Sequence, residues 1–526
     1  MTQTTGTAEA STSPAHAGGV LVGLILVATV ANLNLAVANV ALPDIGVHFQ
    51  TSQTQLDVLS VAFSLGLAGT VLYLGAIGDR FGRKGMLLLG TTLAIPTSIA
   101  AAWAPNITFL IGARVLGGVA AGMAFPTTLA LITALWSGPA RVKSIAAWSA
   151  VGGSMAALGP LLSGLVLSRF WWGSCFLITV PLAFVALFLA ARFVPAHINE
   201  TTDSVDHLGG IFSVIGIIAL VMAINFVSSP GDMKKAELYA IIAVVGLVAF
   251  FIRQRFAKNP LFDLNVASRR IFWVAACAGM VVFGALMGAI FIGMQYLQNV
   301  LGYSTVKAGA SVLPAAVFMM IAAPISARLI ERFGSRITLL IGYTFCFLSF
   351  LSMLLLFTET SGYIDIGIAF SLAGAGVGIA GTPASHSLTG SVPVDRAVMA
   401  SGTADLQRDL GGAIMQSILG ALLTAGYAAS VAKQIAPHSS DVSTSIQNEL
   451  EKSYSSAAAV AQQNPAHAQA IIAGAKSSFL AGANWAYAAG CIAIAVGALI
   501  VGIWFPRRQA EIDLVASYEA EDAHAA

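Results

Sequence analysis

The stretch that decides the fold reads Gly75-Ala-Ile-Gly-Asp79-Arg80-Phe-Gly82-Arg83-Lys84. It places a cluster of charge in a short loop between two long apolar runs. A second stretch, Ile330-Glu331-Arg332-Phe333-Gly334-Ser335-Arg336, repeats the order of an acid, an arginine, a phenylalanine, a glycine and then a basic residue. Each stretch follows the second apolar run in a set of six. We therefore interpret the chain as two related halves.

The composition excludes several classes of protein. Of the 526 residues, 57% are hydrophobic and only 10% are charged, whereas about 25% of the residues in a soluble domain are charged. There are too few polar side chains to cover the surface of a soluble enzyme or a disordered chain. The net charge of +2 provides no basic surface for nucleic acid. The solvent left for so much apolar surface is a lipid bilayer.

The apolar runs predict an all-α polytopic membrane protein. A helix needs about 20 apolar residues to cross the hydrocarbon core, and these runs are continuous rather than alternating, which favours helices over a β-barrel. About fourteen spans are predicted, at 19–42, 55–77, 85–104, 107–135, 144–167, 173–194, 208–228, 237–252, 271–293, 308–330, 337–357, 363–387, 402–426 and 481–504.

The spans group into two six-helix halves with two helices inserted between them, the usual construction of secondary transporters. A polar outer loop at about 427–480 is predicted to form a surface helical hairpin. The predicted units are a disordered cytoplasmic tail at 1–18, the first half at 19–194, the inserted pair and linker at 195–270, the second half at 271–504 and a cytoplasmic tail at 505–526.

The distribution of lysine and arginine predicts the orientation, because loops on the cytoplasmic side carry an excess of these residues. The loops that follow the even-numbered spans hold most of them, and Arg507 and Arg508 follow the last span. Both termini are therefore expected in the cytoplasm. We expect a monomeric, multi-pass protein of the plasma or inner membrane.

Several motifs together resemble a known family. Residues 75–84 look like the signature loop of the major facilitator superfamily. Asn39-Val-Ala-Leu-Pro43, Arg114, Gly159-Pro160 with Gly164, and Gln298-Asn-Val-Leu-Gly302 are similar to motifs of its fourteen-span drug–proton antiporter branch. The resemblance covers nearly the whole chain except for the tails and the outer loop. It implies the major facilitator fold and small-molecule export, and it does not specify the substrate.

Physical chemistry suggests a gate at the signature loop. Gly75 and Gly78 would allow two helices to approach closely, and Gly82 would permit a tight turn. Asp79 could face the positive N-terminal end of a neighbouring helix, which the resemblance places near Ala400–Gly402. The alternative is a charge cluster that only fixes orientation. The candidate gate residues are Gly75, Asp79, Arg80, Gly82, Arg83, Glu331 and Arg332.

Charged residues within apolar spans are the candidates for proton coupling. Asp405 and Asp409 are four apart and share a helix face, and Arg408 can pair with Asp405. Arg114 should face a cavity or an acid, because a charge at the bilayer centre is costly. The alternatives are a wet vestibule around the carboxylates and a structural ion pair for Arg114. Asp57 is a lesser candidate.

The chain departs from the family at Asn34, where the antiporters usually carry an acid. We therefore hypothesise that coupling has moved to Asp405 or Asp409; the rival is a uniporter. The substrate-cavity candidates are Asn34, Asn39, Gln295 and Gln298, although amides also simply tie helices together. Gly159, Pro160 and Gly164 are expected to bend the fifth span.

No enzyme, cofactor or metal site is predicted. The four cysteines lie in apolar stretches without metal-ligand spacing. The function expected is export of amphipathic small molecules or drugs by alternating access, coupled to proton entry, with the proton gradient as the energy source. The alternatives are a dedicated exporter or uniporter of one metabolite, and a non-transporting membrane scaffold or sensor.

Overall fold

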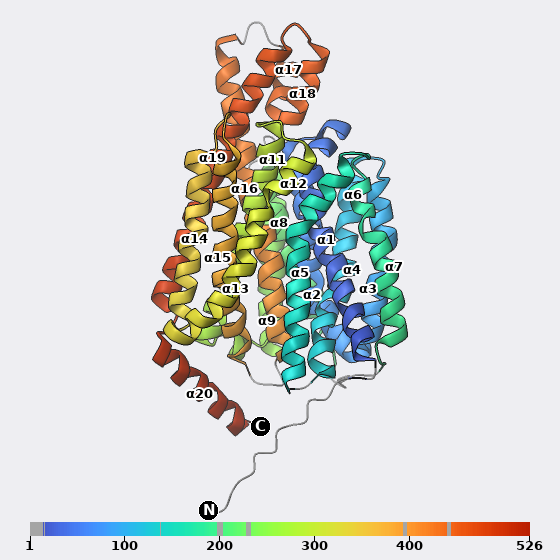
Figure 1. The fold of residues 1–526 in the computed structure, drawn as a ribbon, viewed down its shortest axis with the longest axis vertical. Helices are drawn as coiled ribbons and strands as arrows, with labels where there is room; N and C mark the ends of the chain where they lie inside the picture. Colours follow the sequence, from blue (N-terminus) through green and yellow to red (C-terminus); the bar gives the residue numbers. More distant parts are fainter. Residues whose placement is uncertain are drawn as a thin grey trace, which may run out of the picture.

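The computed structural model describes Pro14 and residues 16–136, 138–196, 204–227, 233–392, 397–438 and 443–525. No β-strand occurs among these residues. Thirteen of the described helices are long and apolar enough to cross a membrane. The fold class is thus the all-α membrane bundle that the apolar runs predict (Figure 1).

The helices follow the chain in two blocks separated by a hairpin. The first block is α1 Ala17–Phe49, α2 Gln53–Phe81, α3 Arg83–Ala102, α4 Ile107–Leu135, α5 Gly138–Leu167, α6 Ser174–Leu177 and α7 Thr179–Phe193. The hairpin is α8 His207–Val227 and α9 Met233–Phe256, followed by α10 Leu264–Ala267. The second block is α11 Arg270–Asn299, α12 Thr305–Ser311, α13 Leu313–Phe333, α14 Ser335–Leu356, α15 Tyr363–Thr389, α16 Ala397–Ile435 and α19 Ala468–Trp504.

The predicted spans and the helices differ mainly in length. The fifth span, predicted at 144–167, lies within α5, a 30-residue helix whose apolar part runs over Leu158–Leu167. It is the one predicted span absent from the thirteen candidates among the described residues. The predicted tail at 1–18 lies largely outside the described residues.

Polar caps fix where several helices begin. The Ser52 side chain accepts from the backbone N–H of Gln55, and the Gln55 side chain accepts from the Ser52 backbone N–H, which forms a capping box at α2. Asn106 caps α4 and Ser304 caps α12 in the simpler way. These caps satisfy N–H groups that a helix end leaves without partners.

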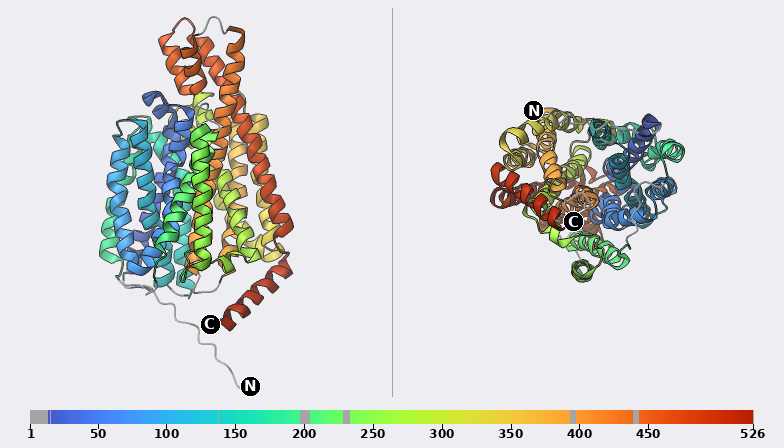
Figure 2. Two further views of the ribbon diagram at one scale, coloured as in Figure 1. Left: turned by 180° about the vertical axis from the view of Figure 1, so that it is seen from behind. Right: turned by 90° about the horizontal axis from the view of Figure 1, so that it is seen from below.

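The two blocks meet along two seams. α2 packs against α16, and α5 packs against α12 and α13. The α8–α9 hairpin packs against α2 and, through α8, against α16, and it lies outside the ring of the two blocks when viewed from below (Figure 2). α9 presents to the outside a stripe of apolar side chains that includes Ile241, Val244, Val245 and Val248, as expected of a surface that faces lipid.

A cap stands beyond the bundle at the end opposite to the C-terminus (Figure 1). We use the name cap for the outer ends of α16 and α19 with α17 Thr444–Lys452 and α18 Tyr454–Gln463, joined to α16 through the short turn Ala436–His438. α16 and α19 extend well past the predicted span limits of 426 and 481 to form it. Two short helices therefore occupy the middle of the predicted outer loop.

The C-terminal tail forms a helix, α20 Arg508–Ala525, that contacts the inner end of the second block. Glu511 accepts hydrogen bonds from the backbone N–H of Ser335 at 3.3 Å and from the hydroxyl of Ser387 at 3.3 Å. Arg269 forms an ion pair with Asp522 at 2.5 Å. The sequence prediction of a plain tail gave no sign of this helix.

Candidate functional site

The two repeated loops have the same backbone geometry. Gly82 joins α2 to α3 with a φ of 112°, and Gly334 joins α13 to α14 with a φ of 82°. Both values lie in the region that favours glycine. In each loop an arginine lies over the next phenylalanine, with Cζ of Arg80 5.3 Å from the ring centroid of Phe81. The corresponding distance from Arg332 to Phe333 is 5.2 Å.

The predicted gate contact is only partly within view. The Asp79 side chain lies outside the described residues, and α16, the helix it was expected to face, packs along α2. A Cβ added at Gly78 would contact Met86 at 3.3 Å, whereas one added at Gly75 would meet no described atom within 4 Å. The close approach predicted at Gly75 is therefore not made in this structure.

Arg114 lies in the interior of the first block, on α4, with 2% of its surface exposed. Its Nη2 donates a hydrogen bond to the backbone oxygen of Asn34 at 2.6 Å. Its guanidinium carbon lies 4.7 Å from the ring centroid of Phe63 and 5.2 Å from that of Phe176. Two aromatic faces and one carbonyl thus surround the charge, and no carboxylate pairs with it among the described residues.

Arg114 also lines a hollow between α1, α2, α3 and α4. It is the one residue of the charged types Asp, Glu, Lys and Arg on the wall, and most of the other lining residues are small or apolar. The polar members besides Arg114 are Asn34, Thr91, Thr97 and Ser98. The prediction that Arg114 faces a cavity or an acid is met by a cavity.

The two carboxylates of α16 are buried where the blocks face each other. Asp405 is 4% exposed and Asp409 is 5% exposed, and in each the Oδ2 atom has no hydrogen-bond partner in the described structure. Asp409 lines a small hollow whose other walls come from α1, α2 and α4 of the first block. Its members are Ala31, Asn32, Leu35, Phe63, Leu67, Phe125 and Asp409.

Arg408 does not form the predicted ion pair with Asp405. Its guanidinium carbon lies 5.2 Å from the ring centroid of Phe283 on α11, and no ion pair joins it to either carboxylate in the described part of the chain. The spacing of three residues permits the pair, but the arginine stacks on a neighbouring helix instead. The two carboxylates are left with unpaired oxygens.

Asp57 belongs to a polar network at the outer end of the bundle. It accepts from the Gln53 amide at 2.9 Å and from the Thr424 hydroxyl at 2.8 Å. The same Gln53 amide donates to Gln295 Oε1 at 3.0 Å. Since Gln53 and Asp57 are on α2 and the other two residues are on α16 and α11, this network joins the two blocks.

The amide candidates divide between two places. Gln295 and Gln298 connect the blocks, because Gln298 donates to the backbone oxygen of Val40 on α1 at 3.1 Å. Asn34 bonds the Val30 carbonyl of its own helix at 3.1 Å and lines the hollow with Arg114. Asn39 is buried, and its Oδ1 atom lacks a partner in the described structure.

The Gly-Pro motif of α5 acts as a packing surface. A Cβ at Gly159 would lie 2.7 Å from Cβ of Ala36 on α1, and one at Gly164 would collide with the backbone of Thr305 on α12. The Thr305 hydroxyl donates to the Gly164 oxygen at 3.1 Å. α5 continues through Pro160 without interruption, so the motif brings the blocks together and does not break the helix.

These features now permit comparison with known proteins. The sequence profile of the Major Facilitator Superfamily matches residues 24–416. The chain belongs to the major facilitator superfamily. As a member of this superfamily it is a multi-pass membrane protein of a transporter family, and the repeated loops and paired six-helix blocks are the features that it shares with the fold.

Its relatives are named as drug exporters. The chain is 30% identical to the multidrug efflux pump LfrA of Mycolicibacterium smegmatis over 95% of this chain and 99% of the pump. It is 29% identical to the methyl viologen resistance protein SmvA of Salmonella typhimurium, over 93% and 98% of the two chains. It is 30% identical to the multidrug resistance protein Stp of Mycobacterium tuberculosis over 76% and 74%.

Solved structures of this superfamily share the fold. An inward-facing, unoccupied bacterial homologue of the lysosomal transporter Spinster superposes with a TM-score of 0.61 at 16% identity, over 95% of this chain and 97% of the other. The partially occluded, inward-open xylose transporter XylE from E. coli gives 0.58 at 14% identity, over 93% and 98%.

The sequence analysis missed several partners of the predicted residues. Gln53 and Thr424 hold Asp57, and Phe63 and Phe176 enclose Arg114. The spacing of Gln53 and Asp57, four apart on one helix, was the one signal available for these contacts. The others join helices that are distant in sequence.

Proposed function

We propose that the chain is a secondary active transporter that exports amphipathic small molecules by alternating access, driven by proton entry. The central observation is that Asp409, a carboxylate of the second block with an unpaired oxygen, faces a hollow walled by the first block. A group at this place is exposed to a different environment whenever the blocks rock against each other. The relatives named as drug exporters support the choice of substrate class.

The mechanism follows from which contacts join the blocks. The network of Asp57, Gln53 and Thr424 and the bond from Gln298 to Val40 close the outer end. In the proposed cycle these bonds break as the inner end closes, and Asp405 or Asp409 exchanges its proton between the two sides. The aromatic and aliphatic walls around Asp409 suit an amphipathic molecule, whose apolar part needs no specific partner.

The proposal includes the cellular setting and what the transporter does not need. The protein acts as a monomer in the plasma or inner membrane with both termini in the cytoplasm, and it binds small molecules rather than nucleic acid. It performs no catalysis and uses the proton gradient without a bound cofactor. No cluster of three metal-ligating side chains occurs among the described residues.

The test uses purified protein in proteoliposomes with ethidium as the probe and an imposed pH gradient. Asp409→Asn should abolish gradient-driven ethidium movement, because an amide cannot carry a proton, while downhill exchange of ethidium remains. Asp405→Asn should be measured beside it. Asp513→Asn, which removes an exposed carboxylate of α20, is the matched control and should leave transport unchanged.

The outcomes separate the proposal from its rivals. Unchanged gradient-driven flux in both α16 variants would reject these carboxylates as the coupling groups. Ethidium movement that ignores the pH gradient in the parent protein would favour the uniporter. Failure to move any of several amphipathic dyes would favour a dedicated metabolite transporter or a non-transporting scaffold.

A further inference from the structure

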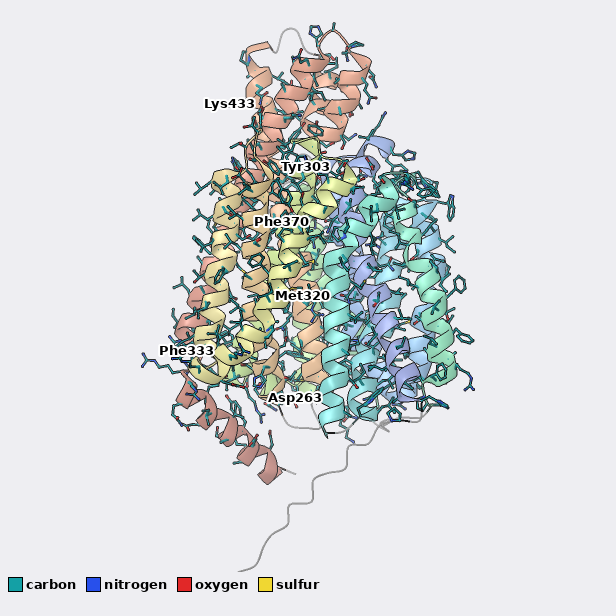
Figure 3. The ribbon with its side chains drawn as sticks, in the orientation of Figure 1. Asp263, Tyr303, Met320, Phe333, Phe370 and Lys433 are labelled. Atoms are coloured by element: carbon teal, nitrogen blue, oxygen red, sulfur yellow. The ribbon has the colours of Figure 1, made fainter. Side chains whose placement is uncertain are left out.

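The cap contains a cavity of its own, separate from the hollows within the bundle. It lies between the outer ends of α16 and α19 and the short helices α17 and α18. Figure 3 labels Lys433 on the cap part of α16, with Tyr303 below it at the outer end of the bundle. The cavity is lined by Tyr427, Val431, Gln434, Ile435, Ile446, Leu450, Ala457, Val460, Asn464, His467, Ala470, Ile471, Gly474 and Ala475.

The cavity is large enough for a small molecule. It holds ≈ 1430 Å³ of empty space and is partly open to solvent, whereas pockets for drug-sized ligands span about 300–1000 Å³. Its walls come from four different helices, so a molecule inside it would be surrounded rather than held on one face. A connector that only joins α16 to α19 would not need such a space.

The chemistry of the walls selects a class of ligand. Most lining side chains are aliphatic, and no aspartate, glutamate, lysine or arginine is among them. Tyr427 is 2% exposed, and its hydroxyl is buried without a hydrogen-bond partner in the described structure. A buried hydroxyl without a partner is destabilising, and an acceptor on a bound molecule would satisfy it. Asn464 and His467 provide further polar groups at the rim.

The cap adjoins the outer end of the first block, next to where the bundle would open. Ser453 Oγ donates to the backbone oxygen of Thr51 at 3.1 Å, and Lys452 Nζ donates to that of Gln50 at 3.4 Å. A Cβ at Gly46 of α1 would contact the side chain of Ser455. Molecules near the outer end of the bundle therefore have direct access to the cap.

We propose that the cap cavity binds a neutral amphipathic small molecule, whose apolar body packs against the aliphatic walls while an acceptor atom takes the hydrogen of the Tyr427 hydroxyl. The site is distinct from the central one. Its occupancy requires no gradient and no transport, so it can be tested even if the proposed export is wrong.

The experiment measures protection of an engineered cysteine in the purified full-length protein in nanodiscs. Ala470→Cys places an exposed thiol on the cavity wall, and its rate of labelling by a water-soluble maleimide is followed with increasing Nile red, a neutral dye with a carbonyl acceptor. Asn448→Cys, exposed on α17 but not lining the cavity, is the control. The parent protein gives the background from its native cysteines.

Nile red is expected to slow labelling at Ala470→Cys and to leave the rate at Asn448→Cys unchanged. Tyr427→Phe keeps the shape of the cavity and should raise the concentration needed for half-protection by about fivefold, as expected for one lost hydrogen bond. Val460→Phe, which fills part of the space, should also weaken protection.

Three results would overturn the proposal. One is the absence of protection at Ala470→Cys at every soluble dye concentration. Another is equal protection at both cysteines, which would mean that the dye acts outside the cavity. The third is unchanged protection in both Tyr427→Phe and Val460→Phe, provided that each variant elutes as the parent does in size-exclusion chromatography.

Discussion

Arg114 is buried within the first block with a backbone carbonyl and two aromatic rings as its partners. A buried cation without a counter-ion is costly, and removing or adding one partner changes stability strongly. The family's usual acid on the first span corresponds to Asn34 here, and Asn34 is the residue whose carbonyl Arg114 touches. The structure thus places the missing acid beside this arginine.

Asn34→Asp should therefore stabilise the protein. A carboxylate at this position can pair with the Arg114 guanidinium, and a hydrogen bond to a charged group contributes about 1.5–3 kcal/mol. The measurement is the thermal unfolding midpoint of purified protein. Asn39→Asp, on the same buried helix but away from any described cation contact, should lower the midpoint. An equal decrease in both variants would contradict the predicted pairing.

The residue contacts at Gly159 and Gly164 lead to a prediction about close packing. Gly164→Leu would force its side chain into the backbone of Thr305, so the seam between α5 and α12 cannot close. We expect transport to fall by more than tenfold and the unfolding midpoint to decrease. Gly112→Leu, where an added Cβ meets no described atom within 4 Å, is the control; a similar loss there would indicate a general effect of bulk.

At the scale of elements, the cap connects the two blocks. It grows from α16 and α19 of the second block, and its helix α18 contacts α1 of the first block. Ser453, which caps α18, also bonds the backbone at Thr51. Since each block moves as a unit in alternating access, this contact must separate whenever the outer end opens.

A disulfide between α1 and the cap should therefore stop transport. A Cβ at Gly46 would lie 3.1 Å from Cβ of Ser455, near the Cβ separation of a disulfide. Gly46→Cys with Ser455→Cys should lose ethidium transport after mild oxidation and regain it with a reductant. Each single variant is a control. Full transport by the oxidised, cross-linked pair would show that the cap and α1 need not separate.

The whole molecule is joined at its outer end by polar contacts between α2, α11 and α16. Asp57 is the centre of this network, and the Thr424 hydroxyl is its contact across the α2–α16 seam. Each such hydrogen bond contributes about 1 kcal/mol, and a difference of that size changes the ratio of two conformations about fivefold. Small changes here should shift the population between outer-closed and outer-open forms.

Thr424→Val should increase the outer-open population by about fivefold, because valine keeps the shape and leaves one Asp57 oxygen without its donor. Spin labels at Ser168→Cys and Thr360→Cys, exposed at the outer ends of different blocks, report the separation by pulsed electron resonance. Thr344→Val removes a hydroxyl that bonds only its own helix and should leave the distance distribution unchanged. An unchanged distribution in Thr424→Val would contradict the role of this network.

The sequence by itself determined the membrane fold and its internal repeat. The number of apolar runs and the twin charged loops are local features, and lipid leaves a chain so poor in charge few other structures. The cap and α20 were not predicted as they stand, because the cap's helices have little apolar periodicity and depend on packing against α1, α16 and α19.

The partners of the charged residues were decided only by the tertiary structure. The sequence identified Arg114, Asp57, Asp405 and Asp409 as charges in apolar spans. It could not tell that Arg114 lies between aromatic rings, that Asp57 joins the blocks or that Arg408 leaves its neighbouring carboxylates for Phe283. The physical reason is that a helix face fixes which residues point together, whereas the helix it meets is set by packing over hundreds of residues.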